Sequence, residues 1–325
     1  MEFEQQLINL FNEKKNLSPK TVSLYIRNLK ILNDNEKIKN LNYLNNIESI
    51  LNKLLKYKEN TKRIYLISIT STLSLFKDIN KKYKKLYDKY YSLMKEKDNE
   101  IKQIPTDQMN ENQKESWLTW DEITNKYNEL KNKVLMSVKS KSISDKYDKY
   151  LLPFMVLALY AHEENEVRRN QDYQLMHVIN KYNEAYPDDK NYLDLTNKVF
   201  IFNVFKTNKS KGQQVIKISE PLFNDIILYL NHYPLSNNIK NIKKDKNPIP
   251  FLVNKEGNIL SQVNSITRIL NKIFGSNVGT SLLRHVFITY KLGPTINKLE
   301  EVASNMGHTL RTQKDYIKNT NEIIV

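Results

Sequence analysis

Apolar residues recur every three or four positions through the first third of the chain, which is the spacing of one helical face. Such stretches cover residues 18–32, 47–55 and 64–76, and a fourth, highly charged stretch runs from 78 to 103. A Ser-Pro pair at 18–19 is typical of a helix start, because Ser caps the first turn and Pro needs no hydrogen bond there. The pattern predicts a four-helix unit over residues 1–105.

The polar segment 106–118 predicts a linker to a second domain over residues 119–325. Thr119 and Glu122, three residues apart in front of an apolar-periodic run, predict a capping box at the start of this domain. The uninterrupted apolar stretch 151–161 predicts a buried helix.

The pattern then changes to the period of strands. Residues 173–179, 198–205 and 213–218 are predicted to form strands, and the Gly-bearing connection between the last two predicts a β-hairpin. Helical spacing returns in the stretches 222–231, 263–274, 281–292 and 296–306 and in a short terminal one. Helices around a small sheet make the second domain α+β.

Amino-acid composition indicates what the protein binds and in which compartment it works. With 325 residues, 40% of them hydrophobic, the chain can build two packed domains. A net charge of +15 indicates a polyanionic partner, most often nucleic acid, because each Lys or Arg set against a phosphate releases a condensed counterion. The absence of Cys excludes disulfides and thiolate zinc sites and suits a reducing compartment. Neither a membrane span nor a signal peptide is recognisable, which predicts an intracellular protein with no membrane partner.

Basic and hydroxyl-bearing residues follow one another in an order that makes chemical sense: the pair Arg168–Arg169, then Lys206, Arg284, His308 and Tyr316. Two guanidiniums can clamp the non-bridging oxygens of a phosphodiester, and a His adds a further donor. This cage stabilises a pentavalent phosphorane and helps a Tyr phenol, whose pKa is normally about 10, to ionise and attack phosphorus. A Lys on a hairpin can protonate the departing sugar oxygen. The chemistry requires no metal and no other cofactor.

Each of these residues has a more ordinary interpretation when it is taken alone. An Arg pair after a helix is most often solvated, and a lysine beside two others in one loop most often meets solvent. Any one of 20 tyrosines is most often a packing or surface residue. The order, the spacing and the terminal Gly-His…Tyr arrangement together favour the catalytic interpretation.

In this order the residues resemble the catalytic set of the tyrosine recombinase (integrase) family, which runs Arg, Lys, His-x-x-Arg, His or Trp, and Tyr. The stretches RRNQDY at 168–173, KT at 206–207 and GHTLRTQKDYIK at 307–318 look most similar to recombinases of virophages, large DNA viruses and related mobile elements. The resemblance implies a helical core-binding domain at 1–105 and a catalytic domain at 119–325 with a small antiparallel sheet. It implies site-specific recombination or genome integration through a 3′-phosphotyrosine intermediate.

The resemblance also implies roles for individual residues. It assigns the nucleophile to Tyr316 and the rest of the catalytic set to Arg169, Lys206, Arg284 and His308.

Two positions need a choice or depart from the family pattern. Arg169 is preferred to Arg168 because it lies three residues before an acidic residue, Asp172, as the first Arg of the family does. Ser281 stands where the family has the His of His-x-x-Arg, and a Ser can donate to a phosphate but cannot act as a base near neutral pH. Arg168 and Ser281 are kept as auxiliary candidates.

The expected partners are double-stranded DNA, in a nucleus or in the cytoplasm, and further copies of the chain in a tetrameric synapse on DNA. Basic residues near predicted helix starts, Lys20, Lys62 and Arg63, are predicted to contact DNA phosphates. Two alternatives stay open. One is a type IB topoisomerase-like enzyme that relaxes supercoils, and the other is a recombinase-derived DNA-binding protein with weakened catalysis, which Ser281 favours.

Overall fold

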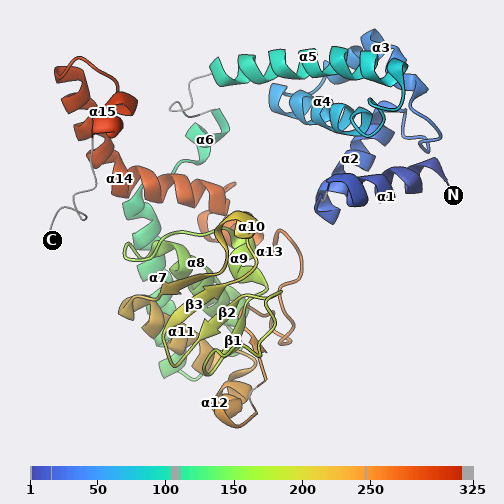
Figure 1. The fold of residues 1–325 in the computed structure, drawn as a ribbon. Coiled ribbons are helices and arrows are strands. Elements are labelled where there is room, and N and C mark those ends of the chain that lie inside the picture. Colours follow the sequence, from blue (N-terminus) through green and yellow to red (C-terminus); the bar gives the residue numbers. More distant parts are fainter. Residues whose placement is uncertain (1, 16, 104–108, 110, 246, 317–325) are drawn as a thin grey trace, which may run out of the picture. The chain divides into compact units, whose positions relative to one another are not determined.

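The computed structural model describes residues 2–15, 17–103, 109, 111–245 and 247–316. The chain divides into two compact units, Met1–Met109 and Asn110–Val325. The first unit is helical, and the second surrounds a small sheet with helices (Figure 1). The chain is therefore mainly α-helical with one small sheet.

The N-terminal unit contains the four predicted helices and one that the sequence analysis missed. The predicted ones are α2 (Pro19–Leu32), α3 (Ile47–Leu54), α4 (Glu59–Leu73) and α5 (Lys81–Gln103), and a 3₁₀ turn, η1 (Asn42–Asn45), precedes α3. The additional helix, α1 (Phe3–Lys15), comes first. It belongs to the fold because its Leu7 and Phe11 are fully buried in the core of this unit. The unit thus has five α-helices among its described residues, which corrects the four-helix expectation.

Local signals and packing fix these helices. Ser18 caps α2 as predicted, since its side chain accepts the Thr21 N–H at 3.2 Å. α4 packs along α5 and α2. Between α2 and α4, buried Asn28 donates to the Ser68 hydroxyl at 2.9 Å, so these two polar side chains satisfy each other inside the core.

The C-terminal unit starts with helices on either side of the predicted boundary. A short helix, α6 (Glu111–Ser116), lies inside the segment expected to be a linker. α7 (Trp120–Lys139) begins with the predicted capping box: the Thr119 side chain accepts the Glu122 N–H, and the Glu122 carboxylate accepts the Thr119 N–H at 2.7 Å. A π-helical segment, η2 (Tyr147–Leu151), leads into α8 (Leu152–Ala161), and every residue of α8 is buried, as predicted.

The sheet has the strand order β4-β3-β2-β1-β5. Its strands are β1 (His177–Ile179), β2 (Tyr192–Asp194), β3 (Val199–Phe202), β4 (Gln214–Lys217) and β5 (Ile249–Pro250). The β3–β4 hairpin is confirmed, with Phe200 opposite Ile216. However, β1 and β2 run parallel, because residues 180–191 return the chain to the same end of the sheet. The sheet is therefore mixed and not purely antiparallel.

Helices complete the second unit and cover its core. They are α9 (Asn170–Gln174), α10 (Asn208–Lys211), α11 (Glu220–His232), α12 (Ser236–Asp245), α13 (Ser265–Phe274), α14 (Thr280–Asn305) and α15 (Leu310–Tyr316). α8 packs against α7, α11 and α13. No helix among the described residues combines the length and the apolarity that crossing a membrane requires.

One long helix, α14, replaces the two helices predicted at 281–292 and 296–306. Pro294 lies inside it, directly after Gly293. A Pro has no N–H, so the carbonyl of Tyr290 loses its intrahelical partner there. Because Tyr290 is exposed, water can solvate that carbonyl, and the helix continues across a sequence that weakens it.

Candidate functional site

Two neighbouring arginines at the start of α9 have different environments. Arg168 donates its Nε–H to the Asp172 carboxylate at 2.9 Å and its Nη1–H to Gln214 Oε1 at 2.8 Å. Its guanidinium also lies 3.8 Å from the centre of the Phe202 ring. Arg168 is therefore held inside the protein between α9 and the β3–β4 hairpin.

Arg169 occupies the position before α9, and its side chain is half-buried. In the described part of the chain its guanidinium makes no hydrogen bond or ion pair, so its donors are available to a ligand. Arg284, in the second turn of α14, comes to the same place: its Nε–H donates to the carbonyl of Val167, two residues before Arg169, at 3.3 Å. Two arginines far apart in the sequence are thus brought together.

A buried carboxyl and a buried hydroxyl lie beneath the arginines. Burial raises the pKa of Asp172, whereas the charges of Arg168, Arg169 and Arg284 act to lower it. The Tyr160 hydroxyl is buried without a hydrogen-bond partner among the described residues, and burial raises its pKa well above the usual value. The guanidinium charges therefore gather over a low-dielectric floor, where their effect on an anion is strong.

Asn191 joins the arginines to the hairpin. Its side-chain amide donates to the carbonyls of Asp172 and Val204, both at 2.9 Å, and its oxygen accepts the N–H groups of Asn203 at 2.9 Å and Val204 at 2.8 Å. All of its polar groups are satisfied by backbone of α9 and of the segment after β3. The sequence analysis missed this residue, because nothing local distinguishes it from the chain's many other asparagines.

Lys206 lies in the turn between β3 and α10 and is exposed. Its neighbour Phe205 lies under the Arg168 guanidinium, 5.1 Å from ring centre to Cζ. Lys209 and Lys211 in α10 are exposed as well. The structure therefore brings the segment before Lys206 to Arg168, with the Lys206 side chain exposed on the turn.

His308 and Tyr316 form a pair of their own at the other end of α14. Gly307 ends α14 with a positive φ of 73°, and the next N–H, that of His308, donates to the Ala303 carbonyl at 3.0 Å, which is a Schellman cap. The His308 ring then stacks on Tyr316, with ring centres 5.5 Å apart. Neither ring nitrogen of His308 has a hydrogen-bond partner among the described residues, and Tyr316 is 67% exposed.

The structure does not bring this pair to the arginines. Arg284 lies near the start of α14, and Asn305 ends this helix about 30 Å further along its axis, at 1.5 Å per residue. His308 and Tyr316 follow that end. Figure 1 shows α15 at the far end of α14 from α9. The predicted site is thus divided into an arginine cluster and a His–Tyr pair.

The remaining candidates, Ser281 and the three predicted DNA contacts, differ in exposure and pairing. Ser281 is exposed one turn before Arg284. Lys20 is exposed, whereas Lys62 pairs with Glu59 at 2.6 Å and Arg63 with Asp98 at 2.7 Å. The charges of the last two are therefore partly neutralised within the N-terminal unit.

A buried charged network behind the site also escaped the sequence analysis. The Asp225 carboxylate accepts hydrogen bonds from the Tyr127 hydroxyl at 2.5 Å and from Lys131 Nζ at 2.8 Å, and it lies 2.8 Å from His162 Nε2. Burial acts to raise the pKa of Asp225, but the hydrogen bonds from His162, Lys131 and Tyr127 outweigh it and lower the pKa. The network ties α7 and the end of α8 to α11.

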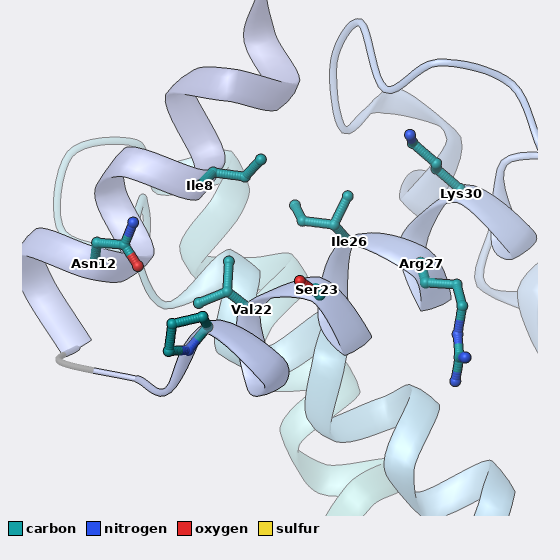
Figure 2. Close-up of a pocket in the computed structure, with 8 residues that line it drawn as sticks. Ile8, Asn12, Val22, Ser23, Ile26, Arg27 and Lys30 are labelled. Atoms are coloured by element: carbon teal, nitrogen blue, oxygen red, sulfur yellow. The ribbon is translucent and has the colours of Figure 1, made fainter. Parts of the chain in front are cut away.

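The N-terminal unit has an apolar hollow of about 440 Å³ between α1 and α2. In Figure 2 the side chains of Ile8, Val22 and Ile26 point toward it and Arg27 extends away, whereas Lys30 reaches to Glu4 of α1 at 2.8 Å. It holds no converging polar groups of the kind that direct a reaction. Within the described residues, no three His, Asp or Glu side chains lie close enough to hold a metal ion.

No known family model matches the sequence, and no curated protein matches it either. Among solved structures, the crystal structure of XerA recombinase is similar at 11% sequence identity. The match covers 98% of this chain and 95% of that one, with a TM-score of 0.33. A TM-score this low does not carry a fold or a function over to this chain.

Proposed function

We propose that the chain is a tyrosine recombinase, a DNA strand-cleaving and rejoining enzyme. The observation that carries the proposal is the convergence of Arg169 and Arg284 near Asp172. Phe205, the residue before Lys206, lies against the neighbouring Arg168. Guanidinium donors left unused over a buried floor suit the two non-bridging oxygens of a phosphodiester. The buried pairing of Arg168 with Asp172 supports Arg169 as the substrate-binding member of the pair.

The proposed reaction is a transesterification in which all bonds balance. Tyr316 Oη gives its proton to solvent and attacks phosphorus, and the bond from phosphorus to the 5′ oxygen breaks, which leaves a 3′-phosphotyrosine and a 5′-hydroxyl. Arg169, Arg284 and His308 stabilise the phosphorane, and Lys206 delivers the proton to the departing 5′ oxygen. Attack by a 5′-hydroxyl reverses the step, so rejoining needs no energy source.

Cleavage requires Tyr316 beside the arginines, so the proposal includes a rearrangement of α14. Its weakest point is Gly293–Pro294, where helix propensity is lowest and one backbone hydrogen bond is missing. Beyond it, apolar side chains are exposed on the far half of the helix, and Ile296 and Val302 are among them. A break at Gly293–Pro294 lets this segment bury those side chains while α15 approaches an arginine cluster, in its own chain or in a neighbouring copy.

We test the proposal by trapping the covalent intermediate. A nicked suicide duplex in EDTA, whose cleaved strand loses a short fragment, should give a protein–DNA band that survives denaturation. Tyr316→Phe should abolish the band, and peptide mapping should place the DNA on Tyr316. Tyr290→Phe, in the same helix–turn–helix segment, is the matched control and should retain the band. A band that persists without the Tyr316 hydroxyl would remove this residue from the role.

One specific observation favours a second candidate, a DNA-binding protein with weak or no catalysis. Tyr316 lies far from the arginines in this structure, and Ser281 offers no base beside Arg284. Full, salt-sensitive DNA affinity with no covalent product on any attachment-site library would support this candidate. Site-independent relaxation of plasmid by a monomer would favour the topoisomerase-like alternative.

The proposed partners are duplex DNA, in the nucleus or the cytoplasm, and further copies of the chain that assemble on it as a tetramer. Lys20, Lys62 and Arg63 remain proposed phosphate contacts. For Lys62 and Arg63 a phosphate would have to compete with Glu59 and Asp98.

A further inference from the structure

A lysine-lined hollow of about 460 Å³ opens in the N-terminal unit, between the start of α5 and the turn that joins η1 to α3. Asn45, Ile47 and Leu86 form part of its lining. The rest consists of four exposed lysines of α5, here called the lysine rim: Lys81, Lys82, Lys85 and Lys89.

The walls of this hollow are fixed in place. Tyr90 is fully buried directly after the lysine rim and donates its hydroxyl to the Leu44 carbonyl at 2.9 Å. Leu86 is buried in the core of the same unit. The hydrogen bond and the apolar contact hold α5 against the η1–α3 turn, so the shape of the hollow does not depend on the lysines.

The positive charge of the rim is not neutralised. Among the described residues, none of its four lysines forms an ion pair. The carboxylates nearest in sequence, Asp78 and Asp88, and Glu48 in the first turn of α3 are exposed, and none of the three forms an ion pair among the described residues either. By contrast, Lys97 near the other end of α5 pairs with both Glu59 and Glu100. The charge at the start of α5 therefore faces solvent.

The positive charge of the lysine rim lies at the N-terminus of α5, where a helix is destabilised by positive charge. The first turn of α5 has no acidic residue and carries Lys81 and Lys82, at the positive end of the helix dipole. Lys81 and Lys85, and Lys85 and Lys89, are like charges four residues apart, which repel each other. Lysines at the positive end of a helix and next to one another destabilise it, and no carboxylate among the described residues pairs with them. Unfavourable charge of this kind indicates a site that binds an anionic ligand. An anion in the hollow would turn each unfavourable interaction into a favourable one.

The arrangement of the rim fits a chain of phosphates better than a single ion. Lys81, Lys85 and Lys89 form a row about 12 Å long on one helical face. A nucleic-acid strand carries one phosphate for about every 3.4 Å of its axis, so the row can face several successive phosphates. Leu86 is buried and Ile47 half-buried, so neither offers the large exposed apolar side chain that inserts into a membrane.

We propose that the lysine rim is a binding site for the phosphate backbone of DNA. It is separate from the predicted contacts at Lys62 and Arg63. Arg63 pairs with Asp98, and Lys62 shares Glu59 with Lys97, so both contacts lie near residues of α5 that are about 12 to 14 Å beyond Lys89. The inference rests on the proposed function, because it takes DNA as the partner. It adds a surface of the N-terminal unit that binds DNA through electrostatic contacts to phosphates and makes no contact with the bases.

The test measures DNA affinity of the full chain as a function of salt. A fluorescein-labelled duplex is titrated between about 50 and 200 mM KCl, and the slope of log K against log salt is determined by anisotropy. The variant is K81Q/K82Q/K85Q/K89Q. We expect its slope to be smaller by about 0.9 for each phosphate that the rim no longer neutralises, a total of about two to four units, with affinity at least about tenfold lower at the lowest salt.

Two control variants separate position from total charge. K14Q/K37Q/K39Q/K56Q removes the same charge from exposed lysines elsewhere in the same unit and should change the slope by less than about one unit. K81R/K82R/K85R/K89R keeps the charge and should bind as the wild type does. Thermal denaturation should show that the Gln variant is folded, because its changed side chains are exposed.

The outcomes distinguish this inference from the proposed function. Equal slopes for the Gln variant and its charge-matched control, or a wild type without DNA affinity, would overturn the lysine rim as a DNA site. Retained DNA binding with loss of binding to phosphatidylserine vesicles would assign the rim to lipid and overturn it as well. If the wild type binds DNA through the rim but Tyr316 never becomes linked to DNA, the proposed function fails and the rim stands.

Discussion

Arg168 and Asp172 form a buried ion pair four residues apart, with Nε 2.9 Å from the carboxylate, while the adjacent Arg169 points its guanidinium to no internal partner among the described residues. The pair fixes the start of α9 against β4 and the Phe202 ring. Two identical side chains, one residue apart, are thus given different tasks by their surroundings.

Exchange of each arginine for Gln should separate these tasks. Arg168→Gln leaves the Asp172 carboxyl buried without its partner and should lower the free energy of unfolding by about 3 kcal/mol. Arg169→Gln should change it by less than about 0.5 kcal/mol but slow covalent trapping about 100-fold or more, because one donor to the phosphorane is removed. Urea denaturation and the suicide-substrate assay measure the two effects. The reverse assignment would show that Arg168 is the substrate-binding residue.

Lys206→Ala should slow cleavage by about 10² to 10⁴ if this lysine protonates the 5′ oxygen. A substrate with sulfur at the 5′ bridging position should restore the rate, because a thiolate leaves without a proton. Lys209→Ala and Lys211→Ala, exposed in α10 of the same connection, are the matched controls and should cleave normally. An equal defect on both substrates would assign Lys206 to binding instead.

Replacing both Gly293 and Pro294 with Ala should stabilise α14 and impair cleavage. Pro294→Ala removes an unfavourable residue worth about 3 kcal/mol in a helix interior, and Gly293→Ala one worth about 1 kcal/mol. If the chain must break there to deliver Tyr316, the double variant should denature at a higher temperature and trap less DNA. Thr295→Ala, next in the same helix, should do neither.

A mixture of Arg169→Gln and Tyr316→Phe chains then tells which subunit provides the tyrosine. Covalent product in the mixture indicates delivery to a neighbouring copy, and its absence indicates delivery within one chain. Normal trapping by the double variant would mean that Tyr316 reaches the arginines by a route other than Gly293–Pro294.

Asp225 should make stability depend on pH at the acidic end. Its hydrogen bonds keep its pKa below the usual 3.8 in the folded state, so their stabilisation is present above that pH and is lost as pH falls through the folded pKa. Asp225→Asn should lower the free energy of unfolding by about 3 kcal/mol at neutral pH, since Lys131 and His162 lose their partner. Its stability should also fall less than that of the wild type on acidification below about pH 4.

Glu129→Gln is the control for this effect. Glu129 pairs with Lys126 and Lys133 on an exposed helical face, where solvent screens the interaction. Urea denaturation across acidic pH should show a much smaller change for this variant. Parallel pH profiles for the wild type and Asp225→Asn would contradict the assignment of the buried network.

Features that arise from neighbouring residues could be predicted from the sequence. Apolar periodicity predicted α2 to α5, and the caps at Ser18 and at Thr119 with Glu122 were confirmed. The apolar stretch of α8 and the β3–β4 hairpin were confirmed too. These signals act over a few residues, so propensity, period and capping suffice to find them.

Features that depend on contacts between distant residues could not be predicted from local sequence. Leu7 and Phe11 place α1 in the core although its own pattern was not recognised, and residues 180–191 make β1 and β2 parallel. The continuity of α14 contradicts the break expected at Gly293–Pro294.

The candidate site divides in the same way. Its residue types and their order could be found in the sequence, because the chemistry of a phosphodiester calls for them. Which member of the Arg168–Arg169 pair turns inward depends on Asp172, Gln214 and Phe202, and two of these come from a hairpin far along the chain. Long-range packing chooses between neighbours that local sequence makes equivalent.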